Sequence, residues 1–153
     1  MSRICEFTTW PAATAVQDNT KPFIIGFTGE RTTFPYAGEF PKGLKIKGKK
    51  VVFRHIPWKG ALPKCHVLFI LPPYDSNPEP VLAVTRGKAV LTVGNSTGLA
   101  DKGVHVNFYT DKNYGERILF ELNVDEIRLS HLKIELPALK AASRLIDTKG
   151  KKK

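Results

Sequence analysis

Hydrophobic residues recur at every second position in two stretches of the second half of the chain. Residues 104–109 read Val-His-Val-Asn-Phe-Tyr, and residues 118–122 read Ile-Leu-Phe-Glu-Leu. A period of two is typical of a β-strand whose two faces meet different surroundings. The segment Thr110–Gly115 lies between them, and it is polar and rich in turn-forming residues. The pattern therefore predicts an antiparallel hairpin.

Four other stretches are apolar almost throughout and short enough to be strands. They are residues 23–27 (FIIGF), 51–56 (VVFRHI), 65–71 (CHVLFIL) and 89–93 (AVLTV). An apolar run without alternation indicates a strand buried on both faces, as in a parallel or mixed sheet that helices cover. We therefore expect a central sheet that these four strands share with the hairpin.

Helices are predicted between and after the strands. A short helix fits residues 80–85, and another follows Asn123, which can cap the first turn together with Glu126. A last helix is expected to begin near Glu135. On one side it would present four apolar residues, namely Leu139, Ala142, Leu145 and Ile146.

The first fifty residues are less regular. Residues 2–9 resemble the end of a helix, which Trp10 and Pro11 stop because the residue before a proline disfavours helical backbone. Residues 12–21 are expected to be a polar connector. Glycines and prolines interrupt residues 29–50, where a short helix is expected around residues 34–40.

This order of elements predicts one mixed α/β domain with a mostly parallel sheet, a late antiparallel hairpin and flanking helices. A length of 153 residues suits a single domain with its own core. We assign this domain to residues 1–148 and predict that the basic tail, residues 149–153, is disordered. No secretory signal is visible at Met1, which fits a cytoplasmic protein as well as one whose leader was removed.

Basic residues are concentrated in one part of the chain. The net charge is +10, and the stretch from Phe40 to Tyr74 holds eight Lys and Arg residues and no Asp or Glu. Such a stretch indicates an anionic partner, such as a nucleic acid, a phospholipid surface or an acidic protein face. A solvated basic surface is the simpler interpretation, because aromatic residues are not interleaved as a base-stacking platform requires.

The two cysteines, Cys5 and Cys65, allow two interpretations. They can form one disulfide that closes a long loop, or they can be two reduced thiols that act as small apolar residues. The absence of a Cys-x-x-Cys pair excludes a zinc ribbon.

Candidate catalytic and ligand-binding residues are few and form no recognised motif. The loop Gly94–Gly98 follows the end of a predicted strand, where α/β sheets bind ligands, but it matches no phosphate-binding fingerprint and turn formation explains it. His55, His66 and His105 would meet across the sheet with Cys65 as soft metal ligands, although structural roles explain histidines in strands more simply. We therefore predict no metal, no cofactor and no enzymatic activity. An enzyme would have to use His105 or Glu121 near the loop Gly94–Gly98.

Several short motifs occur in the same order as in a known family of proteins. They are FTTWP at residues 7–11, FIIG at 23–26, LKIKGKKVV at 44–52, CHVLFI at 65–70, LTVG at 91–94, GLADKG at 98–103, NF at 107–108, FELN at 120–123 and the expected closing helix 136–146. With these motifs, the chain resembles the YfiR family of small bacterial periplasmic proteins from about Ile4 to Ile146. It departs from the family in a shorter first helix without the export signal, so it looks like a trimmed mature domain. It also has an irregular segment at residues 29–40, and Cys65 lacks the additional cysteines of some relatives.

The resemblance implies a non-enzymatic periplasmic regulator that takes part in cyclic di-GMP signalling and biofilm growth. YfiR-like proteins bind the periplasmic region of a membrane diguanylate cyclase and hold it inactive, and some relatives are paired with sensor kinases. The implied partner is one of these membrane proteins, and a second copy of the chain is left open. The alternative is a basic module for anionic surfaces or nucleic acid, although the resemblance does not favour nucleic acid.

The partner-binding face is expected around the basic segment Lys42–Lys50 and nearby exposed aromatics. The residues proposed for it are Phe34, Tyr36, Lys45, Lys47, Lys49, Lys50 and Trp58. Structural roles are expected for Trp10, Pro11, Cys65, Gly94, Gly98, Asn107, Glu121 and Asn123. For Glu121, we expect either a solvent-facing carboxylate or a buried one held by a partner such as a backbone amide or Arg117.

Overall fold

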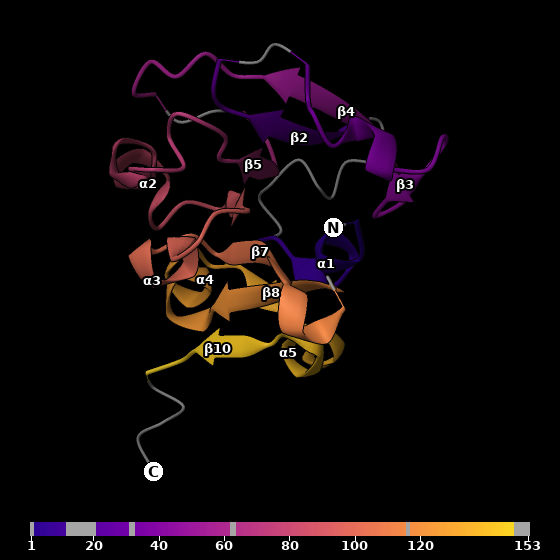
Figure 1. The fold of residues 1–153 in the computed structure, drawn as a ribbon. Helices are drawn as coiled ribbons and strands as arrows, with labels where there is room; N and C mark the ends of the chain where they lie inside the picture. The colour runs from indigo at the N-terminus through magenta and orange to yellow at the C-terminus, as the bar shows by residue number, and fades with distance from the viewer. Residues whose placement is uncertain (1, 12–20, 31–32, 62–63, 116, 149–153) are drawn as a thin grey trace.

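An eight-stranded sheet runs through the molecule in the computed structural model (Figure 1), which describes residues 2–11, 21–30, 33–61, 64–115 and 117–148. Its strand order is β10-β8-β7-β6-β5-β2-β4-β3. Five neighbouring strands are parallel: β2 (Phe23–Phe27), β4 (Lys49–His55), β5 (Val67–Phe69), β6 (Leu91–Gly94) and β7 (Val106–Asp111). The expected mixed, mostly parallel α/β sheet is confirmed.

The strand β2 lies between β4 and β5, which follow it in the chain. From β2 the chain therefore moves first to one side of the sheet and then returns to build the other side. Such a reversal of strand order is a topological switch point, and α/β sheets bind ligands outside the carboxyl ends of strands at such a point.

Antiparallel strands and one parallel strand complete the two edges. The expected hairpin is formed by β7 and β8 (Arg117–Asn123), with Phe108 opposite Phe120. The 3-10 turn η3 (Lys112–Tyr114) lies between them. At one edge, β10 (Arg144–Ile146) pairs in parallel with β8, and at the other, β3 (Lys45–Ile46) pairs antiparallel with β4.

Helices cover both faces of the sheet. The helices α2 (Glu79–Thr85) and α3 (Leu99–Lys102) contribute buried residues to one side. The other side is covered by α1 (Ser2–Glu6), the 3-10 helix η2 (Ala37–Glu39), α4 (Val124–Leu129), α5 (Leu136–Ala141) and a small ribbon of β1 (Thr8–Thr9) with β9 (Lys133–Ile134). Within the described residues, none of the helices has the length and hydropathy that a membrane span requires.

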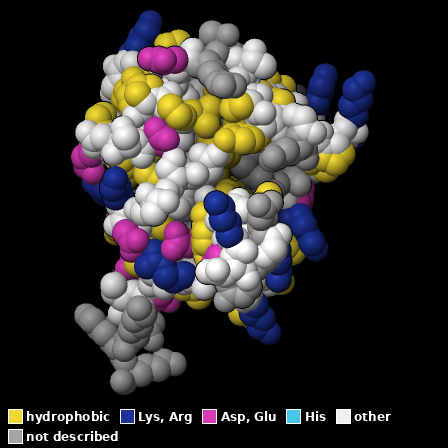
Figure 2. All heavy atoms as spheres, viewed as in Figure 1, with side chains coloured by type: hydrophobic (Ala, Val, Ile, Leu, Met, Phe, Trp, Pro, Cys, Tyr) yellow, Lys and Arg dark blue, Asp and Glu magenta, His cyan; other side chains and the backbone are white. Residues whose placement is uncertain are grey.

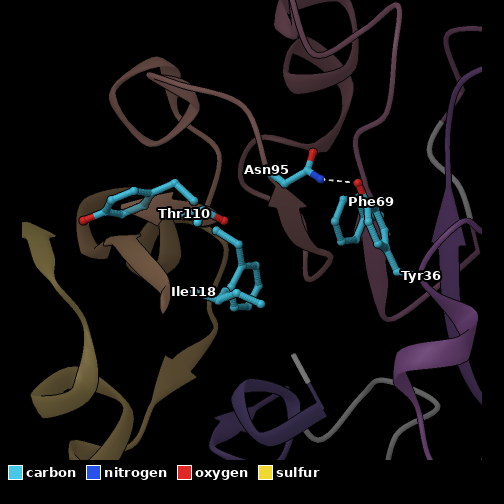
Figure 3. Close-up of a pocket in the computed structure, with 7 residues that line it drawn as sticks. Tyr36, Phe69, Asn95, Thr110 and Ile118 are labelled. Carbon is cyan, nitrogen blue, oxygen red and sulfur yellow. Dashed lines mark hydrogen bonds between the residues drawn. The ribbon is translucent and has the colours of Figure 1, made fainter. Parts of the chain in front are cut away.

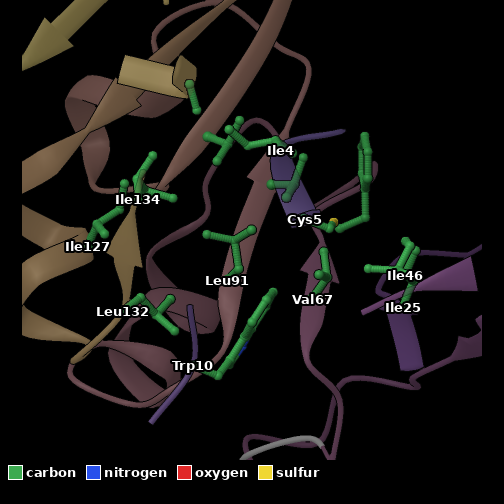
Figure 4. Close-up of a cluster of buried hydrophobic side chains, with 14 of the residues drawn as sticks. Ile4, Cys5, Trp10, Ile25, Ile46, Val67, Leu91, Ile127, Leu132 and Ile134 are labelled. Atoms are coloured by element: carbon green, nitrogen blue, oxygen red, sulfur yellow. The ribbon is translucent and has the colours of Figure 1, made fainter. Parts of the chain in front are cut away.

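The alternation of side chains along the strands divides the interior into two hydrophobic clusters. In β5, Val67 and Phe69 belong to the larger cluster, whereas Leu68 belongs to the smaller one on the opposite face. Figure 4 shows the larger cluster, in which Trp10 from the N-terminal segment and Leu132 from the C-terminal segment approach the same strands. The two ends of the domain are therefore held together by one core.

Trp10 anchors the N-terminal segment to the middle of the sheet. Its side chain is 2% exposed, and its Nε1–H donates to the carbonyl oxygen of His66 at 3.2 Å. The indole also meets the ring of Phe23 edge-on, with centroids 5.5 Å apart. The next residue, Pro11, is half-buried at the end of this anchor.

The expected helix from residue 135 to 146 is wrong in its second half. The helix α5 ends at Ala141, and the backbone of Ala142 is extended, with φ −65° and ψ 139°. Ser143 then donates its N–H to the carbonyl oxygen of Phe120 at 2.8 Å, so the chain enters β10 beside β8. Pairing with the open edge of β8 satisfies backbone groups that a continued helix would leave exposed, and it buries part of Leu145.

Two sequence-based expectations concern segments outside the described residues. The predicted connector at residues 12–21 is described only at Lys21, and the predicted disordered tail at residues 149–153 is not described. Both stay predictions.

Substitution of Gly26 in β2 tests the close packing on the smaller cluster. A Cβ at Gly26 would lie 2.4 Å from Ile56 Cδ1 and 3.1 Å from Cys65 Sγ. We expect Gly26→Ala to lower the free energy of unfolding by about 1–3 kcal/mol, because the surrounding side chains are already packed. Urea denaturation measures this change.

Gly38 provides a matched control for that substitution. A Cβ at Gly38 has no atom within 4 Å. The free energy of unfolding of Gly38→Ala should equal that of the wild type or exceed it by up to about 1 kcal/mol, because alanine restricts the unfolded chain. Equal effects of the two substitutions would contradict the packing described for β2.

Candidate functional site

A groove of about 480 Å³ lies between η2 and the strands β3 and β4. Its apolar part is formed by half-buried side chains that include Phe40, Val51 and Phe53. Exposed lysines surround it, namely Lys42, Lys45 and Lys50. Figure 2 shows Lys and Arg side chains projecting beside hydrophobic ones in this part of the surface. We call this feature, lined by residues 37, 40–45, 50, 51 and 53, the basic groove.

The lysines proposed for the partner face are not equivalent. Lys45 and Lys50 are exposed at the groove, as a partner face requires. Lys47 instead holds the end of α1: its N–H donates to Glu6 Oε1 and its Nζ donates to the Glu6 carbonyl oxygen, both at 2.7 Å. Lys49 is only 2% exposed, and its Nζ donates to the carbonyl oxygen of Lys21 at 3.0 Å. The expectation that Lys49 belongs to an exposed face is therefore wrong.

The aromatic residues proposed for the same face also separate into different roles. Phe34 is 3% exposed, so the expectation of an exposed side chain is wrong for it. Its ring lies within 5.4 Å of Phe27, Phe53 and Phe69, measured between centroids. Trp58 is half-buried against the smaller hydrophobic cluster. Phe34 is a core residue because Phe53 of the strand β4, which lies later in the chain, packs against its ring.

A second hollow, of about 340 Å³, opens at the carboxyl ends of β5 and β6. We call it the aromatic pocket, and its lining is Tyr36, Phe69, Asn95, Phe108, Tyr109, Thr110 and Ile118. Figure 3 shows Tyr36, Phe69 and Asn95 on one side, with Thr110 and Ile118 across from them. Asn95 Nδ2 donates a hydrogen bond to the hydroxyl of Tyr36. Sequence reasoning explained the loop Gly94–Gly98 by turn formation and left a small-ligand site there as the alternative. Asn95 of that loop lines the pocket.

Phe34 separates the aromatic pocket from the basic groove. Its ring centroid is 5.7 Å from that of Tyr36, which lines the pocket, and 6.5 Å from that of Phe40, which lines the groove. The segment that carries these three residues lies between β2 and β3 and packs on the face of the sheet that holds the larger hydrophobic cluster. One buried ring therefore supports both hollows from the inside.

The loop Gly94–Gly98 is built by close packing. A Cβ at Gly94 would lie 2.4 Å from Leu99 Cδ1, and Gly98 has a left-handed backbone with φ 81° just before α3. Asn107 Nδ2 donates to the carbonyl oxygen of Ser96 at 2.8 Å and thereby ties the loop to β7. Close contact with Leu99 therefore explains the glycine at position 94, and the left-handed backbone explains the glycine at position 98.

Glu121 is held by an arginine that sequence reasoning did not pair with it. Arg144 Nε donates to Glu121 Oε2 at 2.6 Å, and Arg144 Nη2 donates to Asp101 Oδ2 at 2.8 Å. The two carboxylates raise the pKa of Arg144, and the hydrogen bond from Arg144 lowers the pKa of Asp101. The network joins the late strand β10 to β8 and α3.

Asn123 joins three elements at the carboxyl end of β8. Its Oδ1 accepts the N–H of Glu126 at 3.1 Å, which confirms the predicted cap of α4. The side-chain Nδ2 of Asn123 donates to the carbonyl oxygen of Ala100 at 2.8 Å. Its backbone N–H donates to the carbonyl oxygen of His105 at 2.9 Å. The side chain is thereby placed to fix α4 against α3.

The strand histidines bond to neighbouring backbone. His105 is 3% exposed, its Nδ1 accepts the N–H of Thr92 at 3.0 Å, and its Nε2 lies 3.0 Å from Ser130 Oγ. His66 Nδ1 accepts the N–H of Ile24 at 2.9 Å, and burial lowers its pKa. His55 Nε2 donates to the carbonyl oxygen of Gly29 at 2.9 Å. Across residues 2–148, excluding the undescribed positions, no three His, Cys, Asp or Glu side chains meet as metal ligands.

The two cysteines are free thiols on opposite faces of the sheet. Cys5 belongs to the larger hydrophobic cluster, whereas Cys65 packs against the smaller one. Burial raises the pKa of each to about 12. Both therefore stay protonated near neutral pH and are poor nucleophiles.

The residues required by the enzymatic alternative do not share a cleft. His105 is sealed between Thr92 and Ser130, and Glu121 is paired with Arg144. Neither side chain belongs to the described lining of the aromatic pocket or of the basic groove.

Sequence comparison adds a family relationship to this geometry. A model of the YfiR/HmsC-like family (DUF4154) matches residues 1–143 of the chain. No curated protein matches it.

The buried His105 predicts a specific pH dependence of stability. Burial lowers its pKa to about 4 in the folded protein, against about 6.5 in an unfolded chain. The unfolded state therefore binds more protons, and stability is lost as the pH falls from 6.5 towards 4. We expect His105 to account for a loss of about 3 kcal/mol over that window, measured by urea denaturation.

Two asparagine substitutions separate this effect from general acid instability. His105→Asn should be less stable than the wild type near pH 7.5, but its stability should fall less on acidification. His131→Asn replaces an exposed histidine whose backbone φ is 60°, a conformation that asparagine tolerates. This control should keep the wild-type slope. An unchanged slope in His105→Asn would contradict the buried neutral imidazole.

Proposed function

The chain belongs to the YfiR/HmsC-like family, and we propose that it is a periplasmic regulatory protein that controls a membrane signalling protein by direct contact. The partner is the periplasmic region of a diguanylate cyclase or of a sensor kinase. Members of this family are generally non-enzymatic regulators. The single structural observation that supports the proposal is the basic groove, which combines apolar contact area with a rim of exposed charge.

The groove has the two properties that a protein-binding site needs. The half-buried rings of Phe40 and Phe53 offer apolar area, and such area supplies most of the affinity at interfaces. The exposed lysines Lys42, Lys45 and Lys50 set the charge that the partner must match. Complementary charge mainly accelerates association and excludes wrong partners. The groove therefore fits a segment that is both apolar and acidic.

Regulation follows if this contact distinguishes two states of the partner. A bound protein shifts an equilibrium only by the difference between its affinities for the two states. To hold a cyclase inactive, the groove must bind the inactive arrangement more tightly. Loss of the contact then restores the partner's own equilibrium and raises cyclic di-GMP.

The basic stretch also supports a second candidate, an anionic surface such as nucleic acid or phospholipid. Lys47 and Lys49, however, form bonds within the fold and are half-buried and buried. The exposed charge is therefore smaller than the sequence suggests. This candidate predicts binding that weakens steeply with salt.

Charge reversal at the groove tests the proposed function. We expect the purified chain to retrieve a membrane cyclase or sensor kinase from envelope extracts at physiological salt. The triple variant Lys42→Glu, Lys45→Glu, Lys50→Glu should bind the retrieved partner's purified periplasmic region at least about tenfold more weakly, because the rim would repel an acidic segment. Calorimetric titration gives the dissociation constants.

A second triple variant controls for net charge. Lys88→Glu, Lys133→Glu, Lys140→Glu makes the same charge change at exposed lysines outside the described lining of the groove. It should bind like the wild type. Retrieval of no membrane signalling protein by the wild type would refute the proposal. Equal weakening in both variants, with steep salt dependence and retention on heparin, would favour the anionic-surface candidate.

A further inference from the structure

The aromatic pocket is separate from the basic groove, and its lining identifies a kind of ligand. We infer that it binds a small uncharged molecule that carries an aromatic ring and a polar group able to exchange hydrogen bonds. This site is distinct from the proposed partner contact, and the inference does not depend on that contact.

The position of the pocket is the first support for this inference. Phe69 ends β5 and Asn95 follows β6, so two neighbouring parallel strands bring these residues to the pocket at their carboxyl ends, while the hairpin of β7 and β8 supplies the opposite wall. The strand β5, which carries Phe69, pairs directly with β2, where the strand order reverses. Ligands of open α/β sheets bind at this place.

The shape of the pocket suits a flat ring. The rings of Tyr36 and Phe69 lie together on one side, with centroids 5.4 Å apart, and Ile118 lies across from them (Figure 3). A volume of about 340 Å³ lies at the small end of the range of ligand sites. Ile118 is 68% exposed, so a bound ring would remove a large apolar side chain from water.

The polar groups of the pocket define the rest of the ligand. Asn95 and Thr110 bring an amide and a hydroxyl to an otherwise apolar lining, and the Tyr36 hydroxyl accepts the hydrogen bond from Asn95. None of the described residues that line the pocket is charged. A charged ligand would lose hydration without gaining a counter-charge, whereas a neutral amide or hydroxyl can exchange hydrogen bonds with Asn95.

Three small probes of equal shape test the inference on the whole chain. Benzamide is neutral, benzoate is an anion and benzamidinium is a cation. Benzamide should shift the amide resonances of Asn95, Phe108, Thr110 and Ile118 in heteronuclear NMR spectra, and it should bind at least about tenfold more tightly than either ion. Because the chain carries a net charge of +10, general electrostatic attraction would instead favour benzoate.

A pair of glutamate substitutions places the binding site. Ile118→Glu adds a carboxylate to the pocket at an exposed position, so the fold is retained and benzamide affinity should fall at least about tenfold. Leu129→Glu makes a similar change at a 57% exposed residue outside the described lining, and benzamide affinity should stay within about twofold of the wild type.

Several outcomes would overturn the inference. They are the absence of benzamide shifts up to its solubility limit, binding of benzoate as tight as that of benzamide, and equal effects of the two substitutions. None of these measurements involves a protein partner, so a failure here leaves the proposed regulatory function standing, and a failure of partner retrieval leaves this inference standing.

Discussion

The position of β2 between β4 and β5 is the constraint on which the rest of the structure depends. Because β2 is paired on both sides and covered on both faces, its apolar residues fix the centre of the sheet. The chain that leaves β2 must pass over one face of the sheet before it returns as the parallel strand β4. That crossing segment carries Phe34, and the basic groove and the aromatic pocket lie on either side of this ring. Both hollows therefore follow from the order of three strands.

Much of the fold could be predicted from the sequence because its signals are local. The run at residues 23–27 became β2 with the expected bounds, and the alternation in residues 104–109 and 118–122 became the β7–β8 hairpin. Asn123 caps α4 because a side chain and an N–H three residues apart suffice for that bond. Such features depend on neighbours along the chain.

The failed predictions concern contacts between distant segments. Residues 144–146 have an apolar pattern that continues α5, but the open edge of β8 recruits them as β10. Lys49 occurs in a lysine-rich segment that looks solvated, yet its ammonium group reaches the carbonyl oxygen of Lys21 inside the protein. The local sequence around Lys49 cannot reveal this hydrogen bond, because the accepting carbonyl oxygen belongs to Lys21, in a segment that lies far from Lys49 along the chain.

The candidate site was predictable only in part for the same reason. Lys45 and Lys50 were placed at an exposed basic surface from composition alone, and the structure adds the apolar part of the groove beside them. The aromatic pocket combines Tyr36, Asn95 and Ile118, which are far apart in sequence. The one local signal was the turn at residues 94–98 after a strand, since strand ends are where α/β sheets bind ligands.

Phe34 prevents the two hollows from being independent. Interiors are close-packed, so a displacement of Tyr36 on one side of Phe34 meets resistance from Phe40 and Phe53 on the other. A ligand that fixed Tyr36 would also restrict the segment that forms the wall of the basic groove. Any coupling between two sites is reciprocal, so a partner seated in the groove would change the affinity of the pocket by the same factor.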